Sequence, residues 1–321
     1  MKLCSSNRAF RLCVLCVSAF SYSLSASAQT PTPRPITIDD YFRILAVHDP
    51  QLSPDGKWVA YAVDKSSLKP DKTQTRIWMV PSSDGDAIPL TAESDSSTHP
   101  RWSPDGKYIA FLSERNDGKT QVWLLNRLGG DAQQLTHTVQ DVDDFVWSPD
   151  SRRLVLVLKD PTPEELNPRK DKSPSAANSP ASADDDSATG DKETKSKKPW
   201  VIDRLQFKVD TVGYLDRRRT HLYVFDLDKK SLTQIISGDY DDSEPAWSPD
   251  SKFLAFTSNR STPDPDLTYN SDIWTVSASN TDKGAHLTQV TTNPGADTTA
   301  TWSPDGQSIA YVTNLDPKLF D

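Results

Sequence analysis

Cysteine is scarce in this chain of 321 residues. Its three cysteines, Cys4, Cys13 and Cys16, all lie in a leader that starts with basic side chains, continues with the apolar run 12–20 and ends in Ala26-Ser27-Ala28. This pattern is typical of a signal peptide. We therefore expect residues 1–28 to be removed on export to the periplasm or the cell exterior. The remaining chain has no cysteine, which excludes disulfides, thiolate nucleophiles and cysteine-bound metals.

Long apolar runs and an excess of basic residues are also missing. The run 12–20 is too short to cross a bilayer, and no later run is long enough, so we expect no membrane span. Removing Lys2, Arg8 and Arg11 from the 36 basic residues leaves 33, against 45 acidic ones, for a net charge of −12. This acidity argues against nucleic acid and anionic membranes as partners.

Recognisable catalytic motifs are absent as well. The chain has no Gly-x-Ser-x-Gly nucleophile motif and no glycine-rich phosphate loop. The nearest match, Gly306 to Ala310, falls within a repeated strand pattern rather than at a strand-to-helix turn. We expect no catalytic residue, cofactor or metal site in this chain. The histidines are scattered without the paired spacing of metal ligands: His48, His99, His137, His221 and His286.

An internal repeat is the most informative feature that is present. Ser-Pro-Asp occurs five times, at intervals of 50, 45, 100 and 55 residues. Trp precedes four of the copies (Trp102, Trp147, Trp247 and Trp302), and Leu52 precedes the first. The repeated turn residues are Ser53, Pro54, Asp55, Ser103, Pro104, Asp105, Ser148, Pro149, Asp150, Ser248, Pro249, Asp250, Ser303, Pro304 and Asp305.

Two further registers repeat together with these turns. An apolar residue lies 12 positions before each of the four tryptophans, and an apolar pair precedes that residue by 13 positions in three units and by 17 in the fourth. Three registers in one order are not expected by chance. The single apolar residues are Leu90, Leu135, Ile235 and Val290, and the pairs begin at Ile77, Val122, Leu222 and Ile273.

The residues of the repeat predict a β-hairpin. Proline presets the second turn position, while serine and aspartate offer side-chain bonds to the backbone. Ser151 and Ser251 replace the final glycine in two copies, so we expect this position not to require a positive φ everywhere. The runs after the turns are apolar at consecutive positions, which indicates strands covered on both faces. Within them, a register of mostly small residues should let neighbouring sheets approach closely: Ala60, Ala110, Val155, Ala255 and Ala310.

Units of about four strands at this spacing predict an all-β chain with the architecture of a β-propeller. We expect a lead-in segment over 29–50 and a partial propeller over 51–321, with four complete four-stranded blades and the start of a fifth. A β-sandwich would not repeat at this interval. A propeller removes its sheet edges by closing, so we also expect the chain to be truncated.

An insertion interrupts the third unit over residues 160–199. Pro, Ser, Ala, Asp and Lys dominate there, without aromatic or β-branched aliphatic residues. This composition predicts a disordered loop. The acidic triplet Asp184 to Asp186 is expected to be solvated rather than to bind a cation, and folding is expected to resume at Trp200.

Two charged clusters lie in the part expected to fold. Arg217 to Arg219 could face an acidic partner or a peptide carboxylate, but a solvated hairpin tip is the favoured interpretation. Asp264 and Asp266 form an Asp-x-Asp pair whose flanking prolines and missing ligands favour a loop over a calcium site. His99 and His137 are expected in the loops that join blades.

Two stretches resemble the propeller of the prolyl oligopeptidase family of serine peptidases, especially its bacterial dipeptidyl-peptidase and acylaminoacyl-peptidase branch. They run from Ile36 to Gly56 and from Ile202 to Val224. The Ser-Pro-Asp-Gly repeat alone is also similar to TolB-type propellers. In the peptidase family, the propeller precedes an α/β-hydrolase domain with a Ser-Asp-His triad and restricts access to short peptides. The resemblance carries none of the triad over, because the matching region is absent here.

The resemblance therefore implies the substrate-gating propeller of an exported serine peptidase. Peptides would be the substrates of a hydrolase domain that this chain does not contain. The alternative is a stand-alone periplasmic TolB-like propeller that binds envelope proteins. A catalytic site borne by the propeller itself has little support from the residues.

Overall fold

The computed structural model describes residues 34–68, 72–115, 118–166, 201–210, 212–261 and 264–314. Contacts divide the chain into a first unit that ends at Arg43 and a second unit that begins at Ile44. The predicted signal peptide lies outside the described residues, and so does the predicted insertion beyond Leu166.

The described part of the first unit contains one short helix, α2 (Ile38–Tyr41). The Asp40 carboxylate accepts a hydrogen bond from the Thr37 backbone N–H at 2.9 Å and pairs with Arg34. The Arg34 contact, followed by the bonds from Thr37, holds the pKa of Asp40 well below its ordinary value. These contacts fix the start of the helix.

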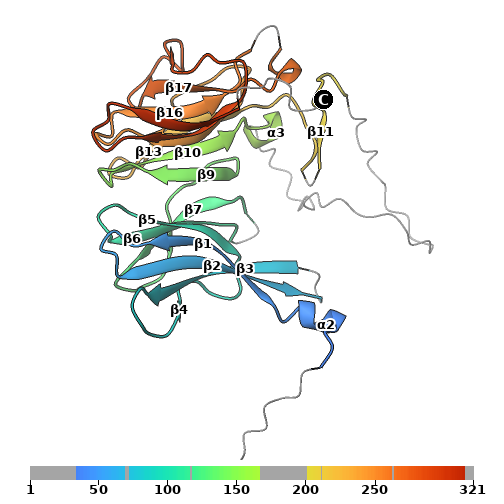
Figure 1. Cartoon of the computed structure of the whole chain (residues 1–321), viewed down its shortest axis with the longest axis vertical. Helices are drawn as coiled ribbons and strands as arrows, with labels where there is room; N and C mark the ends of the chain where they lie inside the picture. The colour runs from blue at the N-terminus through green and yellow to red at the C-terminus, as the bar shows by residue number, and fades with distance from the viewer. Residues whose placement is uncertain are drawn as a thin grey trace, which may run out of the picture. The chain divides into compact units, whose positions relative to one another are not determined.

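The second unit consists of antiparallel sheets, four of which have four strands in the order predicted for propeller blades (Figure 1). In each of them, a Ser-Pro-Asp turn joins the first strand to the second, and the last turn lies in a two-stranded sheet. The predicted all-β propeller class is confirmed. The strands are β1 (Leu45–Leu52), β2 (Trp58–Ser67), β3 (Lys72–Pro81) and β4 (Ile88–Pro89); β5 (Ser97–Trp102), β6 (Tyr108–Ser113), β7 (Gln121–Asn126) and β8 (Gln133–Gln134); β9 (Val142–Trp147), β10 (Arg153–Lys159), β13 (Thr220–Asp226) and β14 (Ser231–Gln234); β15 (Asp242–Trp247), β16 (Phe253–Ser258), β17 (Asp272–Ser277) and β18 (Thr288–Gln289); then β19 (Asp297–Trp302) and β20 (Ile309–Thr313).

The first blade begins earlier than its sequence suggested. β1 starts at Leu45, inside the segment 29–50 that was expected to be only a lead-in. Most of β1 is exposed, so it lacks the apolar run that marks the covered strands. Because β1 is exposed, its sequence does not show the apolar pattern of a covered strand, and the strand was therefore not predicted.

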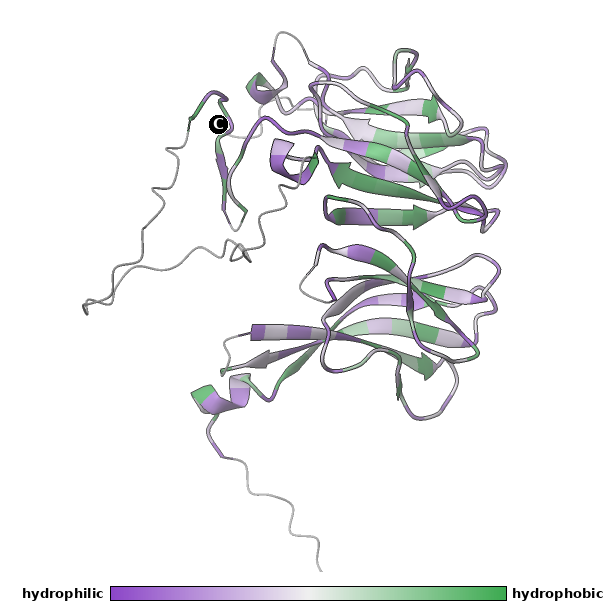
Figure 2. Cartoon of the chain, turned by 180° about the vertical axis from the view of Figure 1, so that it is seen from behind, coloured by the Kyte–Doolittle hydropathy of each residue, from purple (hydrophilic) through white to green (hydrophobic). Residues whose placement is uncertain are grey.

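The core lies between the sheets, where the second strand of each inner blade is covered on both faces as predicted. β10 is buried at five consecutive positions, and Figure 2 shows hydrophobic colouring concentrated on the strands rather than the loops. β20, by contrast, is largely exposed, including Ala310.

The repeated tryptophans join each blade to the one before it. Each indole N–H donates to a backbone carbonyl of the preceding blade, with N···O distances of 3.0–3.3 Å. The accepting residue is the one that precedes that blade's own repeat position, which is Leu52 in the first blade and a tryptophan in the others. Each ring also shares a buried cluster with the small residue of that blade, as Trp147 does with Ala110. The recurrence of both residues therefore reflects one repeated contact between blades.

Bulges interrupt the first strand of all five sheets that contain a Ser-Pro-Asp turn, and the pairing register shifts at these points. In four of these strands, a bulged residue takes a positive φ angle of 49–57°: Asp49, His99, Glu244 and Thr299. His99 therefore lies within β5, so its predicted place in a joining loop was wrong. His137 does lie between β8 and β9. A proline follows three of the four bulged residues, a repeated feature that marks the bulge.

Between β10 and β13 of the third blade, the residues that the structure describes form two small elements. Helix α3 (Pro163–Leu166) falls inside the predicted insertion, so regular structure extends further than its composition suggested. The two-stranded ribbon β11 (Lys208–Val209) and β12 (Gly213–Tyr214) follows residues 201–207, which form no helix or strand. Val201, Ile202 and Leu205 are exposed rather than part of a core.

Candidate functional site: the groove between the second and third blades

The five Ser-Pro-Asp turns share one geometry. The serine hydroxyl donates to the aspartate Oδ1 at 2.5–2.6 Å. That oxygen also accepts a backbone N–H from two residues further on, at 3.0–3.1 Å. The fourth residue closes the turn with an N–H to the serine carbonyl at 2.8–2.9 Å. Serine and aspartate thus satisfy the turn backbone internally.

The fourth turn position has a positive φ in all five copies, so the expectation for Ser151 and Ser251 was wrong. Their φ angles are 60° and 59°, close to the 69–71° of the glycines. The physical reason is the shared turn geometry, which places this position in the left-handed region whichever residue occupies it. Each serine also makes a contact between blades. The Ser151 hydroxyl accepts the Asp105 backbone N–H at 3.0 Å, and Ser251 accepts that of Asp150 at 3.1 Å. These bonds offset part of the left-handed strain.

Substitutions at Ser151 should separate the strain from the hydrogen bond. Ser151→Ala keeps the positive φ and loses the bond, whereas Ser151→Gly loses the same bond but relieves the strain. We expect the alanine variant to be less stable than the glycine variant by about 1 kcal/mol. Urea unfolding midpoints measure the difference. Equal unfolding midpoints for the two variants would show that the backbone at position 151 is not strained.

The turn geometry lowers the pKa of every turn aspartate. For Asp55, the Ser53 hydroxyl is the main cause, followed by the Lys57 N–H, and the pKa falls from 3.8 to about 2. Asp250 and Asp305 follow the same order of causes. At Asp105 and Asp150, burial is the largest single effect and opposes the shift, but the hydrogen bonds together outweigh it.

Acid should therefore weaken the second unit through these turns. A carboxylate with a lowered native pKa stabilises the fold above its ordinary pKa, and this contribution is lost as the pH falls through the native value. We expect the melting temperature to fall between pH 4 and about pH 2. Asp55→Asn keeps an acceptor oxygen without the titration, so its melting temperature should fall less over this interval. If the melting temperatures of the variant and the native chain fell equally over this interval, the assignment to Asp55 would be contradicted.

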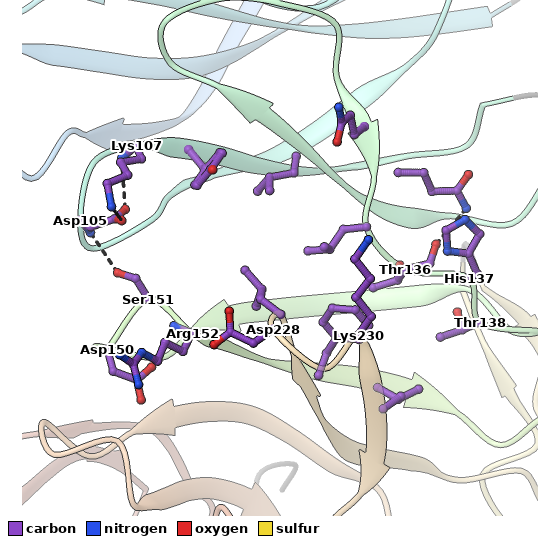
Figure 3. A pocket seen from close by; sticks show the side chains of 18 residues that line it. Asp105, Lys107, Thr136, His137, Thr138, Asp150, Ser151, Arg152, Asp228 and Lys230 are labelled. Atoms are coloured by element: carbon purple, nitrogen blue, oxygen red, sulfur yellow. Dashed lines mark hydrogen bonds and ion pairs between the residues drawn. The ribbon is translucent and has the colours of Figure 1, made fainter.

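A groove of about 810 Å³ opens between the second and third blades. The turn residues Asp105, Asp150 and Ser151 lie at one end, and His137 with its threonine neighbours lies at the other (Figure 3). The lining includes apolar residues of both blades: Leu124, Leu135, Phe225, Leu227 and Leu232. The groove therefore combines apolar walls with one charged end and one polar end.

The charges along this groove are only partly neutralised. Lys107 pairs with Asp105 at 3.0 Å, and Asp150 pairs with Arg153 at 2.9 Å. Arg152 and Lys230 also line the groove, and neither forms an ion pair with any residue that the structure describes. Such a surface suits an amphipathic ligand.

The groove does not assemble a nucleophile with its base. Ser151 and His137 lie at opposite ends of it (Figure 3), and the Ser151 hydroxyl already accepts the Asp105 N–H. The remaining histidines lie beside aspartates. His48 contacts Asp64 and His286 contacts Asp282, whereas His99 lies between Asp49 and Asp144 and His221 between Asp160 and Asp242. Among the described residues, no three metal-ligating side chains converge.

The arginine cluster differs from its prediction. Arg219 is buried, and it contacts Asp239 at 2.9 Å and Asp241 at 3.1 Å. The expected solvated hairpin tip was therefore wrong for this residue, whereas Arg217 remains exposed beside Asp203. The acidic partners lie in the segment between β14 and β15, 20 and 22 positions further along the chain, so adjacent sequence could not reveal them.

The Asp-x-Asp pair also has a structural role. Asp264 caps the short 3₁₀ helix η1 (Pro265–Leu267) by accepting the Asp266 N–H. Asp266 is buried against Arg204 at 2.7 Å. No signal in the sequence joined Arg204 to Asp266, because 62 positions separate them.

In the part of the chain that the structure describes, no helix has the length and apolarity to cross a membrane.

Comparison with known proteins identifies the fold independently. The family model of the tricorn protease N-terminal beta propeller domain matches residues 72–265, which is more than half of the chain. The uncharacterized peptidase YuxL of Bacillus subtilis strain 168 is 30% identical over 224 residues, covering 70% of this chain and 31% of the relative. Dipeptidyl-peptidase 5 of Porphyromonas endodontalis is 28% identical over 280 residues, covering 82% of this chain and 36% of the relative.

A solved structure of acylaminoacyl peptidase from Pyrococcus horikoshii has the same fold. Its TM-score is 0.55 at 17% identity, and the match covers 82% of this chain and 34% of that one. The chain thus spans about a third of the length of the curated relatives it matches. The resemblance to peptidase propellers is confirmed. This chain belongs to the family of tricorn protease N-terminal β-propeller domains.

Proposed function

We propose that this chain is the propeller region of an exported serine peptidase, where it limits access of peptides to a hydrolase domain encoded with it. One observation carries the proposal: two peptidases match most of this chain, yet the chain covers only about a third of each. The described residues supply stacked blades without a nucleophile and base brought together. A region of this kind serves a peptidase by shape and binding rather than by chemistry.

Two measurements test whether the catalytic residues lie in a hydrolase domain outside this chain. Sequencing the coding DNA beyond the codon for Asp321 should reveal a Gly-x-Ser-x-Gly motif, and the purified chain should not react with a fluorophosphonate probe. A stop codon with no such motif nearby would contradict the proposal and favour a stand-alone TolB-like interaction propeller. Labelling of any serine in the purified chain would show a nucleophile inside the propeller.

Gating itself needs the complete polypeptide. We expect it to cleave a tripeptide p-nitroanilide at least about a hundredfold faster than the same sequence within a folded protein, because entry past the blades selects for size. Comparable rates on the two substrates would contradict gating.

Export predicts that the mature chain begins at Gln29. N-terminal sequencing of protein from the periplasm or the medium checks this prediction.

A further inference from the structure

A second, smaller pocket of about 240 Å³ lies beside the β11–β12 ribbon. Arg204 and Gln206, just before β11, line it together with Arg219, just before β13, and Asp266 of η1. All of its lining residues except Pro265 carry a polar side chain. Pockets that hold a whole small molecule usually measure about 300–1,000 Å³. This pocket therefore suits one polar group at the end of a ligand.

The buried charges of this pocket do not balance. The side chains of Arg204, Arg219 and Asp266 are 8%, 5% and 5% exposed. Arg204 donates to both oxygens of Asp266 at 2.9 and 2.7 Å, and Arg219 lies 4.0 Å from the same carboxylate. The closer partners of Arg219, Asp239 and Asp241, are 70% and 51% exposed, so water and salt screen their charges. One buried carboxylate cannot neutralise two buried guanidinium groups, which leaves one positive charge in excess.

The Arg219 guanidinium also has an unused donor. Its Nε and Nη1 donate to Asp239 and Asp241 at 2.9 and 3.1 Å, but no residue that the structure describes accepts a hydrogen bond from its Nη2. The fully buried side-chain atoms without a partner, in the described part of the chain, are Arg115 Nε and Arg260 Nε. Nη2 of Arg219 is not one of them, and Arg219 lines the pocket. The unused donor is therefore accessible from the pocket.

The remaining polar groups favour an acceptor as the ligand. The Gln206 side-chain amide forms no hydrogen bond with any residue that the structure describes, so its N–H groups are also unused. The lining carboxylates are already engaged: both oxygens of Asp266 accept from Arg204. Those of Asp241 accept from Arg219 and from the Thr220 backbone N–H. The pocket thus offers donors at Arg219 and Gln206 while its own anionic acceptors are occupied.

We propose that this pocket binds a carboxylate group of a peptide, which accepts hydrogen bonds from Arg219 Nη2 and the Gln206 amide. An ionised carboxylate only accepts hydrogen bonds, and a guanidinium group binds it strongly. Its charge balances the buried excess, and the bonds from Arg219 to Asp239 and Asp241 stay in place. This inference is independent of the proposed peptidase function, because its test measures binding to this chain and no catalysis.

Calorimetric titration with three short peptides tests the ligand class. The probes are acetyl-dialanine with a free carboxylate, its C-terminal amide, and the amide of acetyl-glutamyl-alanine, in which the only carboxylate is a side chain. In titrations up to about 10 mM, acetyl-dialanine should bind at least about tenfold more tightly than its amide. Binding of the glutamyl peptide as tight as that of acetyl-dialanine would identify any peptide carboxylate as the ligand, and weaker binding would identify the C-terminus. Equal binding of acetyl-dialanine and its amide, or no binding of either carboxylate peptide, would overturn the proposal.

A charged variant of Gln206 locates the binding in this pocket. Gln206→Glu places a carboxylate of nearly equal size beside Arg219, so it should weaken the binding of acetyl-dialanine at least about tenfold through like-charge repulsion. Gln133→Glu adds the same charge at an exposed glutamine outside this pocket; it is the matched control and should bind like the native chain. Arg219→Gln should also abolish binding, and melting curves verify that every variant is folded. Undiminished binding by folded Gln206→Glu would overturn the proposal.

Discussion

Replacing Trp147 by alanine is expected to destabilise the second unit by about 3–5 kcal/mol, which is the usual loss for a buried tryptophan. The ring is 7% exposed and lies in one cluster with Ala110 of the preceding blade. Its indole N–H donates to the Arg101 carbonyl at 3.3 Å. The substitution leaves a cavity at a blade boundary and removes this hydrogen bond. Urea unfolding monitored by circular dichroism measures the loss.

Two controls separate the blade contact from a general effect of truncation. Leu52→Ala changes the equivalent position of the first blade, where the side chain is 62% exposed, and should cost less than about 0.5 kcal/mol. Trp147→Phe keeps an aromatic ring but loses the N–H, and should cost about 1–2 kcal/mol. Similar losses for Leu52→Ala and Trp147→Ala would mean that the repeat position has no special role between blades.

The repeated contacts were predictable because each is encoded locally and recurs. Spacing alone located the turns, the tryptophans and the small residues such as Ala110. The sequence also contains signals that were not used. Thr91, Thr136 and Thr291 each follow a repeated apolar residue, and their hydroxyls accept backbone N–H groups of the third strands. The prolines after Asp49, His99 and Glu244 likewise mark the bulges.

Contacts that occur once between distant segments were not predictable. The Ser151 hydroxyl accepts the backbone N–H of Asp105, which lies in the turn of another blade. Arg219 resembled a solvated arginine because its partners Asp239 and Asp241 lie beyond β13 and β14 in the sequence and only the folded blade brings them to it. A residue type fixes what a side chain can bind, but tertiary structure decides which partner it meets. The groove is of this kind, since its walls come from two blades.

Breaking the Arg204–Asp266 pair should have the other large effect. Arg204→Met leaves the Asp266 carboxylate buried without its main partner, and the loss of one member of a buried ion pair typically costs about 3–5 kcal/mol. The double variant Arg204→Met, Asp266→Leu removes both charges and should recover most of this stability. Arg217→Met is the matched control, because its partner Asp203 is solvent-exposed, and it should cost less than about 1 kcal/mol.

The pH dependence identifies the buried charge as the cause. The hydrogen bonds from Arg204 are the largest cause that lowers the pKa of Asp266, so the native chain keeps this contribution above the ordinary pKa and loses it in acid. Without Arg204, the buried carboxylate favours its protonated form. The penalty of Arg204→Met should therefore be greatest at neutral pH and shrink as the pH falls below about 4. A penalty that stays constant from pH 7 to pH 3 would instead assign the loss to packing of the arginine side chain.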